Sequence, residues 1–177
     1  MPKTAPLFPM IRAALGPDLR EHGFAPMAPP RELKSLFLPW TRTEADGRTL
    51  ELSFQRHHKP WLVDWLGTAF TVNLKLPATD KVDTRIWFLM ELDERARMRA
   101  IHDRIVQRLP DFHEATDLMP GEIMVLEMEW ESLHRPWIPN YEVWFRYRTP
   151  DDLSEWLPFL GELLPVMIER FLRQSQT

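Results

Sequence analysis

Hydrophobic residues recur at helical spacing near the start of the chain. This spacing predicts a helix over residues 6–22. Gly23 then supplies a residue that readily takes the left-handed conformation at a helix C-terminus, and Phe24 supplies the hydrophobic contact that accompanies it. Pro17 lies inside this segment, and its ring and missing N–H predict a kink or a split there. The apolar positions are Leu7, Ile11, Ala14, Leu15 and Leu19.

The pattern then changes to strict alternation, which is typical of half-buried strands. Two alternating stretches flank the segment TEADG at residues 43–47, and its Asp-Gly pair favours a β-hairpin. Pairing Trp40 with Leu50 would place both apolar sets on one face, because side chains alternate with a period of two. The apolar positions are Leu36, Leu38 and Trp40 before the turn and Leu50, Leu52 and Phe54 after it.

A third strand is predicted over residues 68–76, where apolar and polar residues alternate until Pro77. Phe70, Val72, Leu74 and Leu76 share one face, and Thr71, Asn73 and Lys75 share the other. The following run RIWFLMEL, residues 85–92, is short and apolar, so it is consistent with a strand or with the start of a helix. We favour a strand.

Asp93 is a suitable N-cap for a helix that Pro110 would end. Its apolar stripe leaves His102 at the edge, which indicates a half-buried structural histidine. The opposite face carries arginines, which favours a solvated surface or one that receives an acidic partner. The stripe consists of Met98, Ile101, Ile105, Leu109 and Phe112, and the arginines are Arg95, Arg97, Arg99, Arg104 and Arg108.

Alternation returns over residues 122–131 and 141–148, which predicts a second hairpin. Matching its apolar faces places Glu127 or Glu129 near Arg146, and each such cross-strand pair contributes roughly 0.2–1 kcal/mol. Thr149 is then a strong N-cap for a final helix. Pro158 and Pro165 within that helix predict breaks or kinks.

Taken together, the order α-β-β-β-(β)-α-β-β-α predicts an α+β fold. We expect a single, mostly antiparallel sheet of about five to six strands, with helices packed on one face. At 177 residues, a single globular domain over 1–177 is the natural prediction.

Several short segments, in this order, resemble a known family. They are Gly23-Phe24 after the first helix, Leu-Ser-Phe-Gln at 52–55, Phe-Thr-Val-Asn-Leu at 70–74, and an apolar run with tryptophan that leads into an acid-capped helix at 87–93. The order resembles the bacterial family catalogued as domain of unknown function 4304, over about the first two-thirds of the chain. The resemblance implies a compact α+β domain and implies no activity.

Composition and motif content exclude several classes of function. A net charge of −4 argues against a general nucleic-acid binder, and the absence of cysteine removes disulfides and thiol nucleophiles. No apolar run approaches the length of a signal peptide or a membrane span, so we expect a cytoplasmic protein without membrane partners. The glycines form no phosphate-binding motif, and no HExxH sequence occurs, so we expect no cofactor and no metal.

The stretch HHKPW at residues 57–61 is echoed by HRPW at 134–137, and each copy links two predicted strands. Strand parity places both loops at one end of the sheet. They could form a pocket or docking surface. The alternative, which we favour, is that proline fixes each turn and tryptophan covers the core. The residues concerned are His57, His58, Trp61, Trp65, His134, Arg135 and Trp137.

A second candidate surface is the uncovered face of the sheet, where Gln55, Trp144 and Arg146 are expected beside Asn73. A plain solvated face is the alternative. The leading functional hypothesis is a non-enzymatic binding or interaction protein for a protein partner or small ligand. The alternative is a hydrolase or other enzyme that uses His58, His134 and Asp64, with or without a metal. A homodimer is a third hypothesis.

Overall fold

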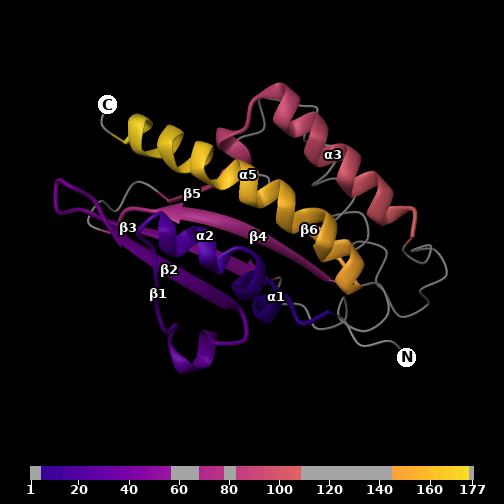
Figure 1. Ribbon diagram of the computed structural model, residues 1–177, viewed down its shortest axis with the longest axis horizontal. Coiled ribbons are helices and arrows are strands. Elements are labelled where there is room, and N and C mark those ends of the chain that lie inside the picture. The colour runs from indigo at the N-terminus through magenta and orange to yellow at the C-terminus, as the bar shows by residue number, and fades with distance from the viewer. Residues whose placement is uncertain (1–4, 57–67, 78–82, 109–144, 176–177) are drawn as a thin grey trace.

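The computed structural model describes residues 5–56, 68–77, 83–108 and 145–175. Over these residues the chain forms an α+β fold with one antiparallel sheet of six strands, as predicted (Figure 1). The strands are β1 (Ala25–Pro26), β2 (Phe37–Thr43), β3 (Thr49–Arg56), β4 (Thr68–Lys75), β5 (Asp83–Arg85) and β6 (Phe145–Tyr147). The helices are α1 (Leu7–Ala14), α2 (Gly16–Glu21), α3 (Leu92–Val106) and α5 (Pro150–Gln174), with short 3₁₀ turns η1 (Arg31–Leu33) and η3 (Ile86–Leu89).

The sheet has the order β1-β2-β3-β4-β5, and β6 pairs with β4. Both β5 and β6 are antiparallel to β4. They occupy different parts of it, since β5 pairs with residues 73–75 and β6 with residues 68–70. The predicted alternation in β3 and β4 is confirmed, because their apolar positions are buried on one face. At the other end of the sheet, β1 pairs with Trp40 and Thr41 of β2.

The first hairpin is confirmed, but its predicted register is wrong. Trp40 pairs with Leu52, and Leu50 pairs with Arg42. β2 continues to Thr43 and β3 begins at Thr49, so the turn is centred one residue later than the predicted pairing implied. Because the shift is two residues, the same side chains still face the core.

The predicted first helix is split, as Pro17 indicated. α1 ends at Ala14, and α2 begins at Gly16 with Pro17 in its first turn, where a missing N–H does no harm. Gly23 has φ +82°, which is the left-handed conformation predicted for it. Phe24 is buried, and its backbone N–H donates to the Leu19 carbonyl at 2.9 Å.

The strand expected over residues 85–92 is wrong for most of its length. Only Arg85 belongs to β5, and Ile86–Leu89 forms the 3₁₀ turn η3. Its buried residues include the adjacent pair Ile86 and Trp87, which an alternating strand with one covered face cannot place together. The next helix begins one residue before Asp93, with Glu91 as the N-cap in place of Asp93.

The C-terminal helix α5 begins as predicted, with Thr149 as N-cap. Pro158 and Pro165 do not break it, because α5 is continuous to Gln174. Pro158 is exposed and Pro165 is half-buried, so the carbonyls that lose a donor lie away from the best-packed side. Its apolar stripe is buried between the sheet, α1 and α3.

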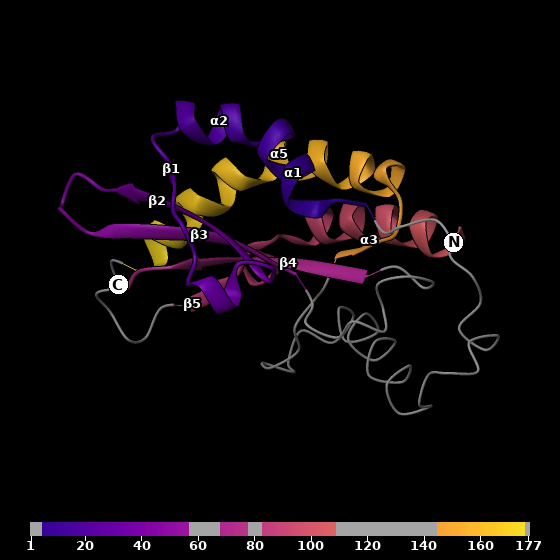
Figure 2. The ribbon, with the colours of Figure 1, turned by 90° about the horizontal axis from the view of Figure 1, so that it is seen from below.

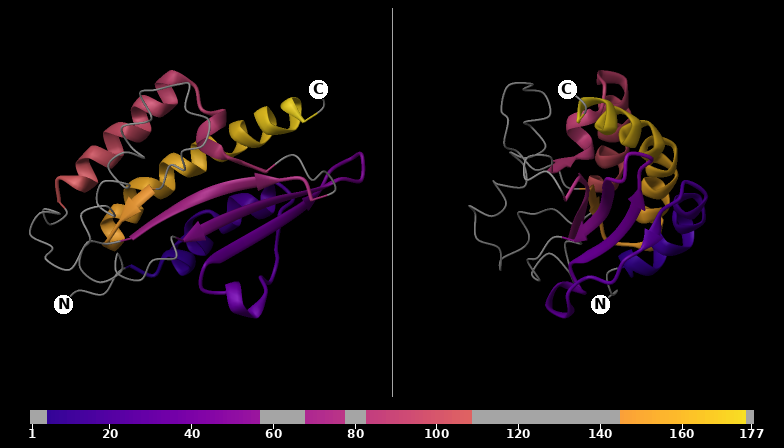
Figure 3. Two further views of the ribbon diagram at one scale, coloured as in Figure 1. Left: turned by 180° about the vertical axis from the view of Figure 1, so that it is seen from behind. Right: turned by 90° about the vertical axis from the view of Figure 1, so that its left-hand side faces the viewer.

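The helices lie on one face of the sheet. Figure 2 shows α1, α2 and α5 above the strands, and α3 lies against α5 and β6. Figure 3 shows the same two layers from the end of the sheet. Among the core aromatic residues, Phe145 lies 5.2 Å from Phe70 and 5.0 Å from Trp156 between ring centroids. The Trp156 indole donates a 2.7 Å hydrogen bond to the Arg146 carbonyl.

Within the described ranges, no helix has the length and apolarity that crossing a membrane requires. The described residues share one hydrophobic core. The prediction of a single domain over 1–177 extends beyond them and stays a prediction.

Candidate functional site

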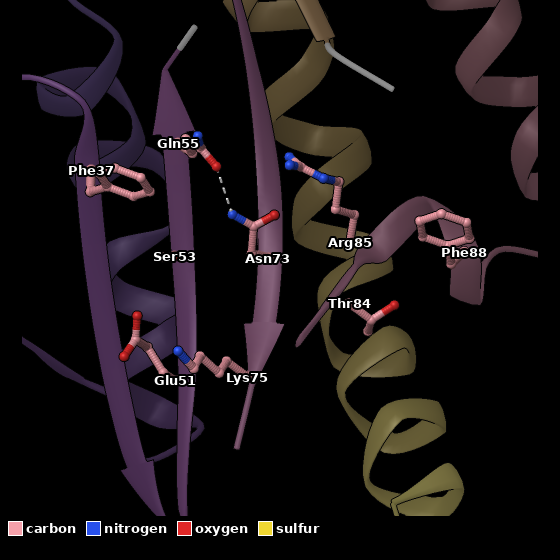
Figure 4. Close-up of a pocket in the computed structure, with 9 residues that line it drawn as sticks. All are labelled: Phe37, Glu51, Ser53, Gln55, Asn73, Lys75, Thr84, Arg85 and Phe88. Atoms are coloured by element: carbon pink, nitrogen blue, oxygen red, sulfur yellow. Dashed lines mark hydrogen bonds between the residues drawn. The ribbon is translucent and has the colours of Figure 1, made fainter. Parts of the chain in front are cut away.

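The face of the sheet opposite the helices, here called the open face, carries a pocket of about 450 Å³ (Figure 4). Five polar residues from the two central strands form its floor: Glu51, Ser53 and Gln55 from β3, and Asn73 and Lys75 from β4. Thr84 and Arg85 of β5 extend the floor, and Phe37 and Phe88 stand at its two sides. We call this hollow the open-face pocket. Its volume is within the range that holds a small molecule.

The alternation of β3 and β4 explains why these residues meet. Their apolar positions face the core, so every second residue must face the other way. The register then aligns Ser53 with Asn73, and Asn73 with Arg85. Two residues further along the strands, on the same face, Glu51 is aligned with Lys75. A row with an alcohol, an amide and a guanidinium therefore lies beside a row with a carboxylate and an ammonium group.

Two amides at the centre of the pocket bind each other. The Asn73 side-chain nitrogen donates to the Gln55 side-chain oxygen at 3.1 Å. Asn73 Oδ1 is buried and accepts no hydrogen bond from any described residue. Turning both amides over would put the Asn73 nitrogen where the unsatisfied oxygen now lies, so one polar atom remains to be satisfied in either orientation. Buried polar atoms of this kind normally bind water or a ligand.

Two aromatic side chains flank the polar floor. Phe37 is half-buried on β2, and Phe88 is 40% exposed although its neighbours in η3 are buried. Figure 4 shows the two rings on opposite sides of the amide pair. An exposed phenylalanine beside a polar floor offers apolar contact to a bound molecule.

Part of this site follows from sequence, and part does not. Alternation places Gln55 and Asn73 on the polar face of the sheet, and both line the open-face pocket. Ser53, Lys75 and Glu51 were predicted to be on polar faces but were not identified as candidates. Phe88 and Arg85 were missed because the run 85–92 was interpreted as a regular strand. The run of consecutive apolar residues at 86–90, which does not alternate with polar ones, could have indicated that the strand ends at Arg85.

Arg146, which was expected on the uncovered face of the sheet, is not among the residues that line the open-face pocket. It is 6% exposed and is aligned with Ala69, at the end of β4 remote from the Asn73–Lys75 pairing with β5. β6 contacts α3, and the charge of Arg146 acts on His102 of that helix, so this polar position is buried where it was expected to face solvent. Its predicted partners Glu127 and Glu129 lie outside the described residues.

The two loops with the sequence His-x-Pro-Trp also lie outside the described residues, so their convergence stays a prediction. The same holds for the acid–base hypothesis. The residues concerned are His57, His58, Trp61, Asp64, Trp65, His134, Arg135, Trp137 and Trp144. In the part of the chain that the structure describes, no three histidine or acidic side chains gather in a way that could hold a metal ion.

His102 is a buried structural residue, more deeply so than the half-buried position predicted. It is 7% exposed, and its Nδ1 lies 3.3 Å from Asp103 Oδ1. Burial, together with the positive charges of Arg146 and Arg99, lowers its pKa to about 4, although Asp103 opposes the shift. His102 is therefore neutral at neutral pH.

The four arginines of α3 and Arg108, which follows the helix, bind partners within the chain. Arg95 lies over the Trp87 ring with 5.2 Å between guanidinium carbon and ring centroid. The other four donate to carboxylates, three of them on α5. The partners are Glu162 for Arg97 (2.6 Å), Asp103 for Arg99 (2.8 Å), Glu155 for Arg104 (2.9 Å) and Asp152 for Arg108 (2.9 Å). An acidic partner from another molecule would have to displace these contacts.

No protein-family model, curated protein or solved structure matches this chain. The resemblance to the domain of unknown function 4304 family therefore stays a prediction. The open-face pocket is the best-supported candidate site among the described residues, and its interpretation rests on its own chemistry.

Proposed function

We propose that this protein is a binding module that holds a small polar molecule in the open-face pocket. The observation that carries the proposal is the buried Asn73 oxygen at the centre of a hollow of about 450 Å³. A polar group on a bound molecule would satisfy the atom at that position, which is an acceptor in the orientation described and a donor N–H if both amides are turned over. The surrounding hydroxyl, amide and charged side chains would orient the molecule.

Binding is supported over catalysis by the kinds of residue in the pocket. Its floor combines the amides of Asn73 and Gln55 with the charged ends of Glu51, Lys75 and Arg85. Among the described residues that line the pocket there is no histidine, and the one carboxylate, that of Glu51, is aligned with the ammonium group of Lys75. A general acid or base needs a group that can exchange a proton near neutral pH. The residues here suit recognition by hydrogen bonds and charge.

The proposal is tested by screening the purified protein against a library of small polar molecules. Binding is detected through the NMR signals of the side-chain amides of Asn73 and Gln55. The chain has two asparagines and four glutamines, so these signals can be assigned with single substitutions. We expect at least one molecule to shift both pocket amides and to leave the Gln107 and Gln174 amides unchanged.

The test variant is Asn73→Leu, which keeps a similar side-chain size but removes the amide. Ligands found in the screen should lose most of their affinity for this variant. Thr84→Val, at the margin of the pocket, should change the affinity much less. If no library member shifts the pocket amides, or if Asn73→Leu binds as well as the native protein, the open-face pocket is not the binding site.

A further inference from the structure

The charges around the open-face pocket are unevenly placed. Lys75 is aligned with Glu51 on one side and with Asp83 on the other, so acidic residues flank it in the register. Arg85 belongs to the next row, aligned with Asn73. Figure 4 shows its side chain extending beside Asn73, on the opposite side from Gln55. Lys75 and Arg85 are the two cationic residues of the described lining, and Arg85 is the one beside the amide pair.

A guanidinium next to side-chain amides has a specific binding chemistry. Arginine presents its N–H groups in a planar fork that matches the two oxygens of a carboxylate or a phosphate. With both amides turned over, the Asn73 nitrogen takes the place of the unsatisfied oxygen and can donate to an oxyanion, as can the hydroxyl of Ser53. Ser53 is 7% exposed, so the floor at this point is shielded from bulk water, which strengthens charge-assisted hydrogen bonds.

We propose that the open-face pocket binds the oxyanion of a small organic ligand, a carboxylate or a phosphate, through Arg85 and the neighbouring amides. This inference rests on the proposed function and names the chemical class of its ligand. Lys75 contributes a weaker attraction because acidic residues flank it. Glu51 repels the oxyanion and confines it to the Arg85 side of the pocket.

The first experiment compares probes that have the same four-carbon skeleton but differ in charge. Succinate, succinamide and putrescine are titrated at millimolar concentration, and the side-chain amides of Asn73 and Gln55 are followed by NMR. Succinate should shift both signals, and the neutral and cationic probes should not. Inorganic phosphate forms a separate arm, and the tighter of the two anions identifies the preferred oxyanion.

The second experiment uses variants whose effects differ in sign. Arg85→Gln should weaken binding of the anion at least about tenfold, the change expected for losing a charge-assisted contact. Glu51→Gln should strengthen it about threefold, because a nearby negative charge is removed. Arg12→Gln, which removes an equal charge from an exposed position of α1, should leave the affinity unchanged.

Arg85→Lys shows whether a loss reflects recognition or misfolding. It keeps the charge but not the planar fork, so it should fold and bind with intermediate affinity. Circular dichroism and the amide spectrum establish that each variant is folded.

The possible failures are distinguishable. Binding of succinamide or putrescine without binding of the anions, or weaker anion binding by Glu51→Gln, would overturn the oxyanion proposal and leave the binding function intact. If no probe and no library member shifts the pocket amides, both proposals are wrong.

Discussion

Arg108 donates a 2.9 Å hydrogen bond to Asp152, and this contact joins the segment after α3 to the first turn of α5. Asp152 is 2% exposed. Its other side-chain oxygen accepts from the backbone nitrogens of Arg148 and Thr149, both at 2.8 Å. One carboxylate therefore accepts hydrogen bonds from the backbone at the start of α5 and also connects this helix to the segment that follows α3.

We expect Asp152→Ala to lower the free energy of unfolding by about 2–4 kcal/mol. The substitution leaves two backbone donors without an acceptor in a buried position and removes the partner of Arg108. Asp151→Ala is the matched control, since Asp151 is exposed and contributes mainly through the helix dipole, about 0.5 kcal/mol. Urea unfolding measures both values. Equal losses for the two variants would contradict the role assigned to Asp152.

Stability should depend on pH through His102. Its pKa is lowered to about 4 in the folded protein, mainly by burial, from the usual 6.5. Below pH 6.5 the unfolded chain binds a proton that the folded protein does not, so stability falls until about pH 4 and is fully present above pH 6.5. The change is at most about 3 kcal/mol.

The comparison with His102→Gln isolates this effect, because glutamine does not titrate and the acidic residues are common to both proteins. Urea unfolding of the two proteins between pH 4 and 7 should show a smaller loss of stability in the variant. Parallel curves for the two proteins would show that His102 does not take up a proton on unfolding.

Gly161→Ala should stabilise the protein by about 0.5–1 kcal/mol, because alanine loses less backbone entropy in a helix than glycine. A Cβ at Gly161 would lie 3.5 Å from Leu15 Cδ2, an ordinary contact between α5 and the junction of α1 and α2. The reverse change Ala100→Gly, at an exposed position of α3, should destabilise by a similar amount. Thermal unfolding of the two variants tests both signs, and destabilisation by Gly161→Ala would mean that the helices cannot accommodate the methyl group.

Gly23→Ala and Gly47→Ala should each destabilise by about 1 kcal/mol or more. Both glycines are left-handed, with φ +82° and +83°, where a side chain is strained. A Cβ at Gly23 would also lie 3.3 Å from Arg42 Cδ, whereas at Gly47 it meets nothing within 4 Å. Urea unfolding should therefore show a loss for Gly23→Ala that equals or exceeds the loss for Gly47→Ala. A clearly smaller loss at Gly23 would indicate that the end of α2 rearranges.

The sequence predicted those parts of the fold in which local pattern and tertiary packing agree. Phe70, Val72 and Leu74 alternate with polar residues, and β4 buries them on one face. Pro17 predicted the division of the first helix because its effect on the backbone is local. The register of Trp40 was wrong by two residues, because alternation fixes which face a residue occupies but leaves every even shift allowed.

The candidate site was only partly predictable for a related reason. Alternation placed Gln55 and Asn73 on the polar side of the sheet, but it carries no information on what covers that side. Arg146 occupies an equivalent polar position on β6, which contacts α3, and there it is buried. Phe88 reaches the pocket because it lies in a 3₁₀ turn. A turn of four residues is too short to produce a recognisable hydrophobic pattern in the sequence.

β1 determines how readily another polypeptide can extend the sheet. It is two residues long, and Pro26 has no N–H to offer to an incoming strand. An edge this short and lacking a donor discourages the strand addition that leads to open-ended assembly. A homodimer of this protein would therefore need a surface other than the exposed side of β1.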